Sequence, residues 1–310
     1  MSTSFCQLCG QPISGRGHLL RHPQWSKDQA LRICADCYQN KPRCHLCNMP
    51  MSSNLPGGLC PTCARLPSQV AQGRFCRACG KSIHKHTSCI EIEGAGLYCQ
   101  DCYHNRPPCD VCGAPQTDER WQLSDGRISC AHCHATAVYT PAEAVELYEQ
   151  MKTAAAQSLG LTLNIPTGLA LVDRTQLAEI IHQQVEVSPP LPDAEPIDPE
   201  RTLGIYTRRG LRRGIYVQNG LPRSLLLQVA AHEFAHAWQG ENCPLLQNSL
   251  VREGFAEWVA YTLLGEFGQK QMQHRMHSRP DLYGQGLRWA LNVAAQDGAV
   301  GVIQACRESN

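Results

Sequence analysis

Cysteine pairs of the form CxxC dominate the first 133 residues and constrain the fold of this chain more than any other feature. Of the 19 cysteines, 17 lie before residue 134, and 16 of those form eight CxxC pairs. A CxxC pair lets two thiolates bind one tetrahedral Zn²⁺, with Zn–S bonds of about 2.3 Å. Disulfide frameworks seldom place nearly every cysteine in such pairs, so we expect metal modules in a reducing compartment.

The eight pairs form two copies of one unit. The segment "CADCYQNKPRCHLC" (34–47) matches "CQDCYHNRPPCDVC" (99–112), with the same gap of six residues between the pairs. This repeat predicts two small units rich in β-hairpins, at residues 1–67 and 74–137, each holding two zinc ions. The expected structural ligands are Cys6, Cys9, Cys34, Cys37, Cys44, Cys47, Cys60, Cys63, Cys76, Cys79, Cys99, Cys102, Cys109, Cys112, Cys130 and Cys133.

The spacing alone leaves the pairing of these ligands open. In a sequential scheme the first and second CxxC pairs of a unit share one ion, whereas in a cross-brace scheme the first and third pairs share it. A unit of about 60 residues with few large apolar side chains buries little core, so zinc should supply much of its folding energy. His86 and Cys89 are interpreted as loop residues, and Cys243 and Cys306 as small buried side chains.

Charge and composition argue against several classes of function. The formal net charge is +1, and neither cysteine unit has a stripe of Lys and Arg with interleaved aromatics, so we expect no nucleic-acid partner. No run of about 18 apolar residues is present, and the first residues do not resemble a secretory signal. The sequence therefore predicts a cytoplasmic protein without a membrane partner.

After residue 133 the sequence changes to amphipathic helices and short strands, which predicts a third domain at 140–310. Helices are expected at 140–161, 174–184, 221–240 and 251–268, and strands at 161–166 and 169–173 and in a hairpin of 202–209 with 214–219. Ser224 and Gly240 are the expected ends of the third helix, and 187–200 is expected to be a loop. The chain is assigned to the α+β class, with zinc-ribbon modules before a mainly helical domain.

The segment "VAAHEFAHAWQG" (229–240) lies in the third of these helices. His232 and His236 are four residues apart and therefore share one face, as two ligands of one ion must. Glu233 follows the first histidine and could reach a water at that ion. The motif is weak by itself, because such short patterns also occur by chance in helices that bind no metal.

The next helix, "VREGFAEWVAYTLLGEFG" (251–268), strengthens the metal hypothesis. It places Glu253 in the spacing HExxH-x16-E, as expected when two His and one Glu hold Zn²⁺ and leave one position open. The part "REGFAEW" closely resembles the glutamate-bearing helix of the aminopeptidase N family, in which the Glu before Gly is the ligand. Glu257, one turn later, could orient a ligand histidine. Two alternatives stay open: Glu257 as the ligand, and a helix pair without metal.

Five segments together carry a resemblance to a known family. They are "PPCDVCGAPQTDERWQLSDGRISCAHC" (107–133), "LYEQMKTAAAQSLGLTLNIPTGLALVDRTQLAE" (147–179), "GLPRSLLLQVAAHEFAHAW" (220–238), "REGFAEWVA" (252–260) and "YGQGLRWALN" (283–292). In order and spacing they resemble the plant LIM-peptidases of the "DA-one" growth-regulator family, which are ubiquitin-activated zinc peptidases. The resemblance covers roughly residues 76–305.

This resemblance implies a LIM-type zinc region joined to a peptidase that hydrolyses peptide bonds in protein substrates. It favours sequential pairing of the cysteines and places the zinc histidines and the catalytic glutamate at His232, His236 and Glu233. The implied cofactors are one catalytic and about four structural zinc ions. The implied partners are protein or peptide substrates and proteins bound by the LIM-like modules. Because cysteine pairs begin at Cys6, we expect no counterpart of the family's ubiquitin-interacting helices here. The first cysteine pairs also lack the histidine of ordinary LIM domains, so the modules are LIM-like.

The expected activity is that of a gluzincin-type zinc metallopeptidase, with Glu233 as the base that takes a proton from water and passes it to the leaving amine. Tyr283, with Arg288 behind it, is the candidate donor to the developing oxyanion; a buried tyrosine at a loop–helix junction is the simpler interpretation. The strand at 214–220 is the expected rim along which an extended substrate adds. The alternative is a non-catalytic zinc-module adaptor whose peptidase-like domain only binds partners.

Overall fold

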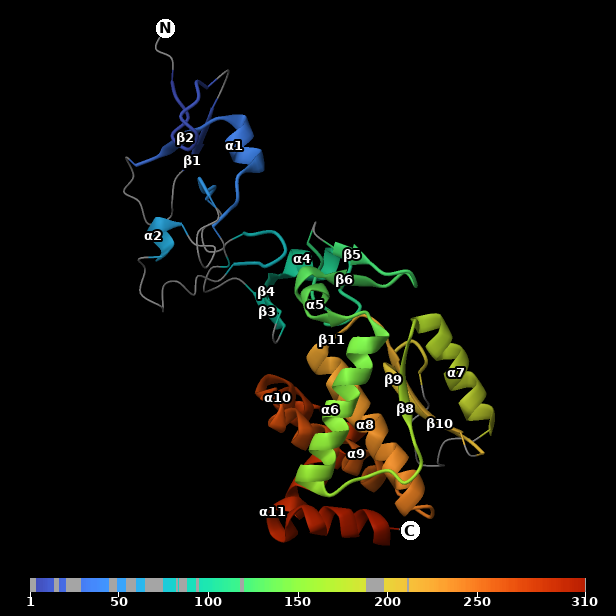
Figure 1. Cartoon of the computed structure of the whole chain (residues 1–310). Helices are drawn as coiled ribbons and strands as arrows, with labels where there is room; N and C mark the ends of the chain where they lie inside the picture. The colour runs from blue at the N-terminus through green and yellow to red at the C-terminus, as the bar shows by residue number, and fades with distance from the viewer. Residues whose placement is uncertain are drawn as a thin grey trace. The chain divides into compact units, whose positions relative to one another are not determined.

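The computed structural model describes residues 4–13, 17–20, 29–44, 49–53, 60–64, 75–81, 83, 88–92, 95–117, 120–187, 198–210 and 212–309 (Figure 1). The chain packs as two compact units. Unit 1 comprises Met1–Pro108 with Gly113–Thr117, and unit 2 comprises Cys109–Cys112 with Asp118–Asn310. Helices and small sheets occur together, which confirms the expected α+β class.

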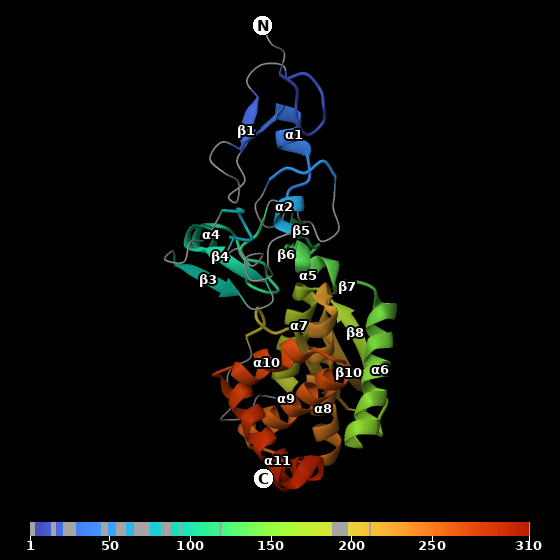
Figure 2. The ribbon, with the colours of Figure 1, turned by 90° about the vertical axis from the view of Figure 1, so that its left-hand side faces the viewer.

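Unit 1 contains one small motif twice, a two-stranded antiparallel sheet followed by a short helix. The first copy consists of β1 (His18–Leu20), β2 (Leu31–Ile33) and α1 (Ala35–Asn40), and the second of β3 (Cys89–Ile92), β4 (Gly96–Cys99) and α4 (Gln100–Asn105). Figure 2 shows β3 and β4 side by side next to α4. In both copies the residue before the helix is a cysteine, Cys34 or Cys99, whose sulfur accepts a hydrogen bond from the backbone N–H three residues later. The sequence repeat is therefore also a repeat of local structure.

Short elements also lie beside other cysteines in both units. In unit 1, α2 (Pro61–Ala64) follows Cys60; in unit 2 the elements are β5 (Arg120–Gln122), β6 (Ile128–Cys130) and α5 (Ala131–Ala135). The last pairs thus pack with the C-terminal part of the chain, whereas the domain limits 1–67, 74–137 and 140–310 stay a prediction. Among the described residues, no helix combines the length and the apolar composition that a membrane span requires.

A three-stranded sheet lies at the centre of unit 2, in the order β8–β10–β9. The strands are β8 (Gly168–Val172), β9 (Gly204–Arg209) and β10 (Arg212–Gln218). β9 and β10 form the expected antiparallel hairpin, and β8 pairs with β10 in parallel. Because β10 is the central strand, the expectation that residues 214–220 form a free rim is wrong; β9 lies at the edge.

Helices cover both faces of this sheet (Figure 1). α7 (Arg174–Val187) lies on one face, where Leu177 and Ile181 form a small core with Ile205. α6 (Pro141–Leu159) and α8 (Arg223–Asn242) lie on the other, where Ile215 and Val217 enter the main core. Tyr216, between them on β10, packs against the small core on the α7 side, so successive side chains of β10 point to opposite faces, as in a strand covered on both sides.

Three expectations about local structure in unit 2 are wrong, each for a physical reason. Residues 161–166 form no strand, because the backbone N–H groups of Asn164 and Ile165 donate to the carboxylate of Glu241. α8 begins at Arg223 instead of being capped by Ser224, because the preceding β11 (Leu221–Pro222), paired with β7 (Ala137–Val138), leads directly into it. It also continues past Gly240 to Asn242.

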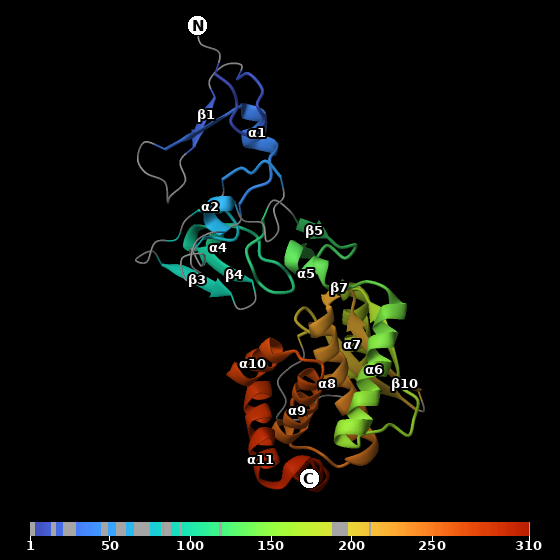
Figure 3. The ribbon, with the colours of Figure 1, turned by 60° about the vertical axis from the view of Figure 1, so that its left-hand side comes forward.

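Two further helices, α9 (Ser249–Glu266) and α11 (Leu282–Glu308), pack along each other, with the shorter α10 (Lys270–Ser278) between them in sequence (Figure 3). A Cβ atom on Gly254 would lie 2.6 Å from the carbonyl oxygen of Gly286, and one on Gly286 would lie 2.6 Å from the Cα of Gly254. Only glycine at both positions lets the two backbones approach this closely. The contact brings the first turns of α9 and α11 together.

Candidate metal centre

Three groups of four cysteines bring their sulfur atoms within 4.8 Å of one another. They are Cys6, Cys9, Cys34 and Cys37; Cys76, Cys79, Cys99 and Cys102; and Cys109, Cys112, Cys130 and Cys133. Each group joins two CxxC pairs that are consecutive in the sequence, which is the sequential pairing. In each group one sulfur of the first pair lies 3.8–3.9 Å from a sulfur of the second pair. A tetrahedron with Zn–S bonds of about 2.3 Å has edges of about 3.8 Å.

A fourth group contains Cys44, Cys60 and Cys63. Its expected fourth ligand, Cys47, lies outside the described residues, as does His86. The interpretation of Cys89 as a loop residue is wrong, because it begins strand β3. It belongs to none of the groups formed by the described residues. The cysteine groups could therefore hold structural metal ions, as predicted.

Backbone amides prepare some of these thiols to ionise. Burial alone would raise the pKa of Cys6, but hydrogen bonds from the backbone of Cys34, Cys9 and Leu8 outweigh it and lower the pKa to about 6. The same balance lowers the pKa of Cys76 to about 7. The thiolate is the metal-binding form, so these shifts favour ligation near neutral pH.

The second kind of site joins α8 and α9. His232 Nε2 lies 3.0 Å from His236 Nε2, and Glu253 Oε2 lies 3.3 Å from the first and 3.4 Å from the second. In a tetrahedron the ligand–ligand distance is about 1.63 times the bond length, so bonds of about 2.0–2.1 Å predict edges of about 3.3–3.4 Å. The two edges to Glu253 match this geometry, and the edge between the two histidines is about 0.3 Å shorter. The three atoms could therefore hold a metal ion together, and Glu253, rather than Glu257, completes the triangle.

Charge accumulates around this triangle. Burial alone would lower the pKa of His232, but its contacts with Glu253 and Glu257 outweigh burial and raise the pKa to about 10. For Glu253 burial acts in the opposite direction and alone would raise the pKa, yet the neighbouring histidines hold this pKa well below its usual range. The carboxylates thus create a place that attracts a cation.

The other ring nitrogen of each histidine lies near an oxygen atom. Glu257 Oε1 lies 3.2 Å from His232 Nδ1, but the contact lacks hydrogen-bond geometry, so the orienting role of Glu257 stays a prediction. Gln239 Oε1 lies 2.8 Å from His236 Nδ1, and its amide nitrogen donates to the carbonyl of Arg252, beside Glu253. The role of Gln239 was not foreseen, although its position three residues after His236 on the same helical face is a readable signal.

Removing the Gln239 contact should weaken metal binding. Gln239→Leu leaves His236 Nδ1 without its partner and should lower zinc affinity at this site by about 10- to 100-fold, as losses of such partners do. Competition with a chromophoric chelator measures the zinc affinity of the variant and of the unaltered chain. Gln304→Leu, on the exposed side of α11, is the matched control and should leave affinity unchanged; equal affinities for both variants would contradict the role of Gln239.

Glu233 lies beside the triangle and is held by the edge strand. Its Oε2 accepts a hydrogen bond of 2.7 Å from the backbone N–H of Tyr206 on β9. The residue is 8% exposed. β9 can approach α8 this closely because Gly204 packs against Val229, where a Cβ would clash. This hydrogen bond fixes one carboxylate oxygen of Glu233. The HExxH motif alone could not predict which backbone amide donates it.

Tyr283 also lies at the site, at the start of α11. Its ring centroid is 5.9 Å from that of His232, and the guanidinium of Arg279 stacks 4.7 Å over the ring. Burial and the charges of Glu253 and Glu233 raise the pKa of Tyr283, so its hydroxyl stays protonated and can donate. Arg279, which the sequence did not single out, also pairs with Asp281 at 2.7 Å.

Arg288, expected behind Tyr283, contributes indirectly. Its guanidinium donates to the carbonyls of His277 and Arg279 and so braces the segment between α10 and α11. Asp281 caps α11 by accepting the N–H of Gly284. The predicted position of Tyr283 at a loop–helix junction is therefore confirmed, and the structure brings it to the metal triangle.

Comparisons of the chain with protein-family models, with curated proteins and with solved structures each found no match.

Proposed function

We propose that this chain is a zinc-dependent peptidase that hydrolyses peptide bonds in protein substrates. The observation that supports it most is the triangle of His232, His236 and Glu253 atoms, with edges of 3.0–3.4 Å, next to a carboxylate, Glu233, that is not needed to complete it. The N–H of Tyr206 engages one oxygen of that acid, which leaves the other oxygen for a water at the ion. The arrangement is of the gluzincin type, with ligands from two consecutive helices.

The side chains have distinct roles in this proposal. A zinc ion at the triangle would supply Lewis acidity to the scissile carbonyl and to the attacking water. Glu233 accepts the proton of that water and delivers it to the leaving amine. Tyr283 donates its hydroxyl hydrogen bond to the oxyanion that develops on the carbonyl. Gln239 and Glu257 orient the two histidines.

The cysteine groups are LIM-like zinc modules in this proposal. Their thiols, free of disulfides among the described residues, suit the reducing cytoplasm. The modules would bind protein partners or present substrates. The alternative, an adaptor without catalysis, has the same four cysteine groups and differs only at the α8–α9 site.

Metal content and cleavage together test the proposal. The chain should contain five zinc ions and, given a mixture of proteome-derived peptides, should produce new N-termini detectable by mass spectrometry. The variant His232→Gln/His236→Gln should contain four and cleave nothing, because two of the three ligands are lost. His274→Gln, an exposed histidine of α10, is the control and should retain both properties. Four zinc ions and no cleavage in the unaltered chain would support the adaptor instead.

A further inference from the structure

The turn between β9 and β10 carries four arginines, Arg208, Arg209, Arg212 and Arg213, which we call the arginine hairpin. Residues 204–220 contain no acidic residue, although the whole chain has a net charge of only +1. Positive charge is therefore concentrated in this one turn.

The described contacts of the arginine hairpin are with neutral oxygens. Arg208 donates to the carbonyl of Gly240, Arg209 to the side chain of Gln183, and Arg213 to carbonyls within the turn. By contrast, the arginines at 127, 174, 223 and 279 each pair with a carboxylate. Within the part of the chain that the structure describes, no carboxylate pairs with the arginine hairpin.

A nearby acid is already occupied. The charge of Glu241 raises the pKa of Tyr206, whereas the charges of Arg208 and Arg213 lower it, so all three residues lie near this tyrosine. The two carboxylate oxygens of Glu241 accept hydrogen bonds from the backbone N–H groups of Asn164 and Ile165. Glu241 therefore does not neutralise the hairpin by a direct ion pair.

The arginine hairpin continues the edge strand that passes the candidate active site. β9 pairs with β10 on one side only, and the N–H of Tyr206 points to the other side, toward Glu233. At a rise of about 3.4 Å per residue, Arg208 lies about 7 Å further along the strand. An extended peptide that pairs with β9 beyond Tyr206, whose N–H donates to Glu233, would therefore carry side chains from the neighbourhood of Glu233 to the arginines within two to four residues.

We propose that the arginine hairpin is a docking surface for acidic side chains of a peptide that extends along β9. The chain then selects protein segments that have Asp or Glu two to four residues from the peptide bond that is cleaved beside Glu233. The cleavage part of this inference rests on the proposed peptidase function, whereas the binding part does not. The carboxylates form charge-assisted hydrogen bonds with guanidinium groups that have no acidic partner among the described residues.

Binding of matched peptides tests the surface without requiring catalysis. Two fluorescent peptides, identical except for Glu or Gln at three consecutive positions, are titrated with the Glu233→Gln protein and followed by anisotropy. The Glu peptide should bind about 5-fold more tightly at low salt, as two exposed charge pairs predict, and the preference should fall as salt rises. Replacing the four arginines by Gln should abolish the preference without changing the zinc content. The control, Arg120→Gln/Lys270→Gln, removes exposed charges elsewhere and should retain it.

Three results would overturn the inference. The first is equal affinity for the two peptides, and the second is a preference that survives the fourfold replacement. The third is tighter peptide binding after Asp193→Asn/Glu195→Gln, which would mean that an acidic segment of the chain itself occupies the hairpin. A preference for the Glu peptide without cleavage by the unaltered protein would support the docking surface while contradicting the peptidase function.

Discussion

Glu233→Gln should lower kcat for peptide cleavage by about 10²- to 10⁴-fold, the usual contribution of a general base, while the chain keeps all its zinc. The amide of Gln cannot accept a proton from water, but its oxygen can still accept the hydrogen bond that Tyr206 N–H gives to Glu233. The residue is not part of the ligand triangle of His232, His236 and Glu253. Cleavage rates and zinc content of the purified variant measure the two effects separately.

A matched control distinguishes loss of the base from loss of charge. Glu266→Gln, on an exposed position of α9, should leave both kcat and zinc content unchanged. Unchanged cleavage by Glu233→Gln would exclude Glu233 as the base, and loss of one zinc would show that it is a ligand. If both expectations hold, the inactive variant also serves to trap protein substrates for identification.

The groups that could hold metal ions were predictable because their arrangement depends on short-range periodicity. A spacing of four residues places His232 and His236 on one face of any α-helix, and a CxxC pair closes on one ion within a single turn. The sequence also predicts the β9–β10 hairpin and the helix α6, which the structure shows. Predicting these features requires no knowledge of the distant segments that pack against them.

The residues that escaped prediction act through contacts between distant segments. The bond from Tyr206 N–H to Glu233 spans 27 positions, and it arises only because Gly204 lets β9 approach α8. Arg279 reaches the site because two glycines bring α9 and α11 together. The order of the strands in the sheet could not be predicted either. Either strand of a hairpin can lie at the sheet edge, and only the pairing of a third strand with one of them decides which.

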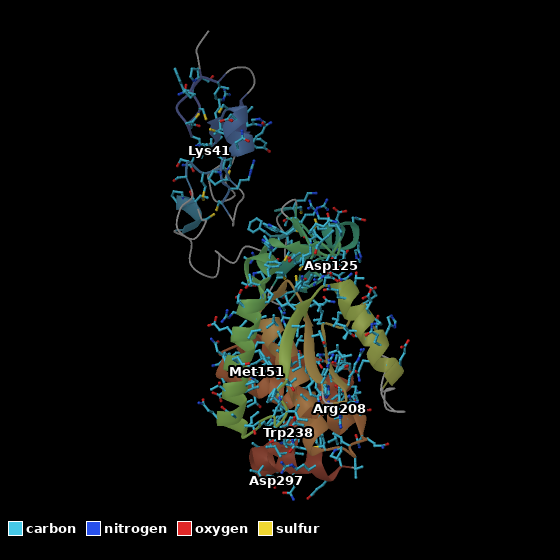
Figure 4. All side chains as sticks on the ribbon, turned by 45° about the vertical axis from the view of Figure 1, so that its right-hand side comes forward. Lys41, Asp125, Met151, Arg208, Trp238 and Asp297 are labelled. Carbon is cyan, nitrogen blue, oxygen red and sulfur yellow. The ribbon has the colours of Figure 1, made fainter. Side chains whose placement is uncertain are left out.

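The contact that joins the last cysteine group to the sheet also spans a long distance in sequence. Arg127, in the turn between β5 and β6, pairs with Asp125 at 2.9 Å and donates to the side chains of Gln218 and Asn219 at the end of β10. Figure 4 shows Asp125 near the start of α7, where its carboxylate accepts the N–H of Arg174. Arg127 and Asp125 have side chains only 2% exposed.

Arg127→Met should therefore destabilise unit 2 by about 3–5 kcal/mol, because it leaves the charge of Asp125 buried without its partner. For a unit of this size that corresponds to a fall in Tm of about 6–20 °C, at 2–4 °C per kcal/mol. Cleavage should fall as well, since Gln218 also donates to the carbonyl of Thr202, just before β9. Thermal unfolding and peptide cleavage measure the two effects.

Two comparisons identify the buried pair as the cause of this loss. Arg120→Met, in the same hairpin but exposed, should change Tm little, and a similar fall there would contradict the argument. Adding Asp125→Asn to Arg127→Met should recover part of the loss, because the uncompensated charge is removed.

The pH dependence of the Arg127→Met effect tests the same pair independently. Burial alone would raise the pKa of Asp125, but the hydrogen bond from Arg174 N–H and the charge of Arg127 outweigh it, so the pKa lies below its ordinary value. A carboxyl whose pKa is lowered by folding stabilises the protein above the unfolded pKa of about 3.9, and this stabilisation is lost as pH falls through the lowered folded value. The Tm difference between the unaltered chain and Arg127→Met should thus be constant from pH 6 to 8 and shrink in acid. Both proteins lose zinc from the same thiolates at low pH, so zinc loss does not change the Tm difference between them. A Tm difference that instead grew in acid would show that Arg127 does not act through the Asp125 carboxylate.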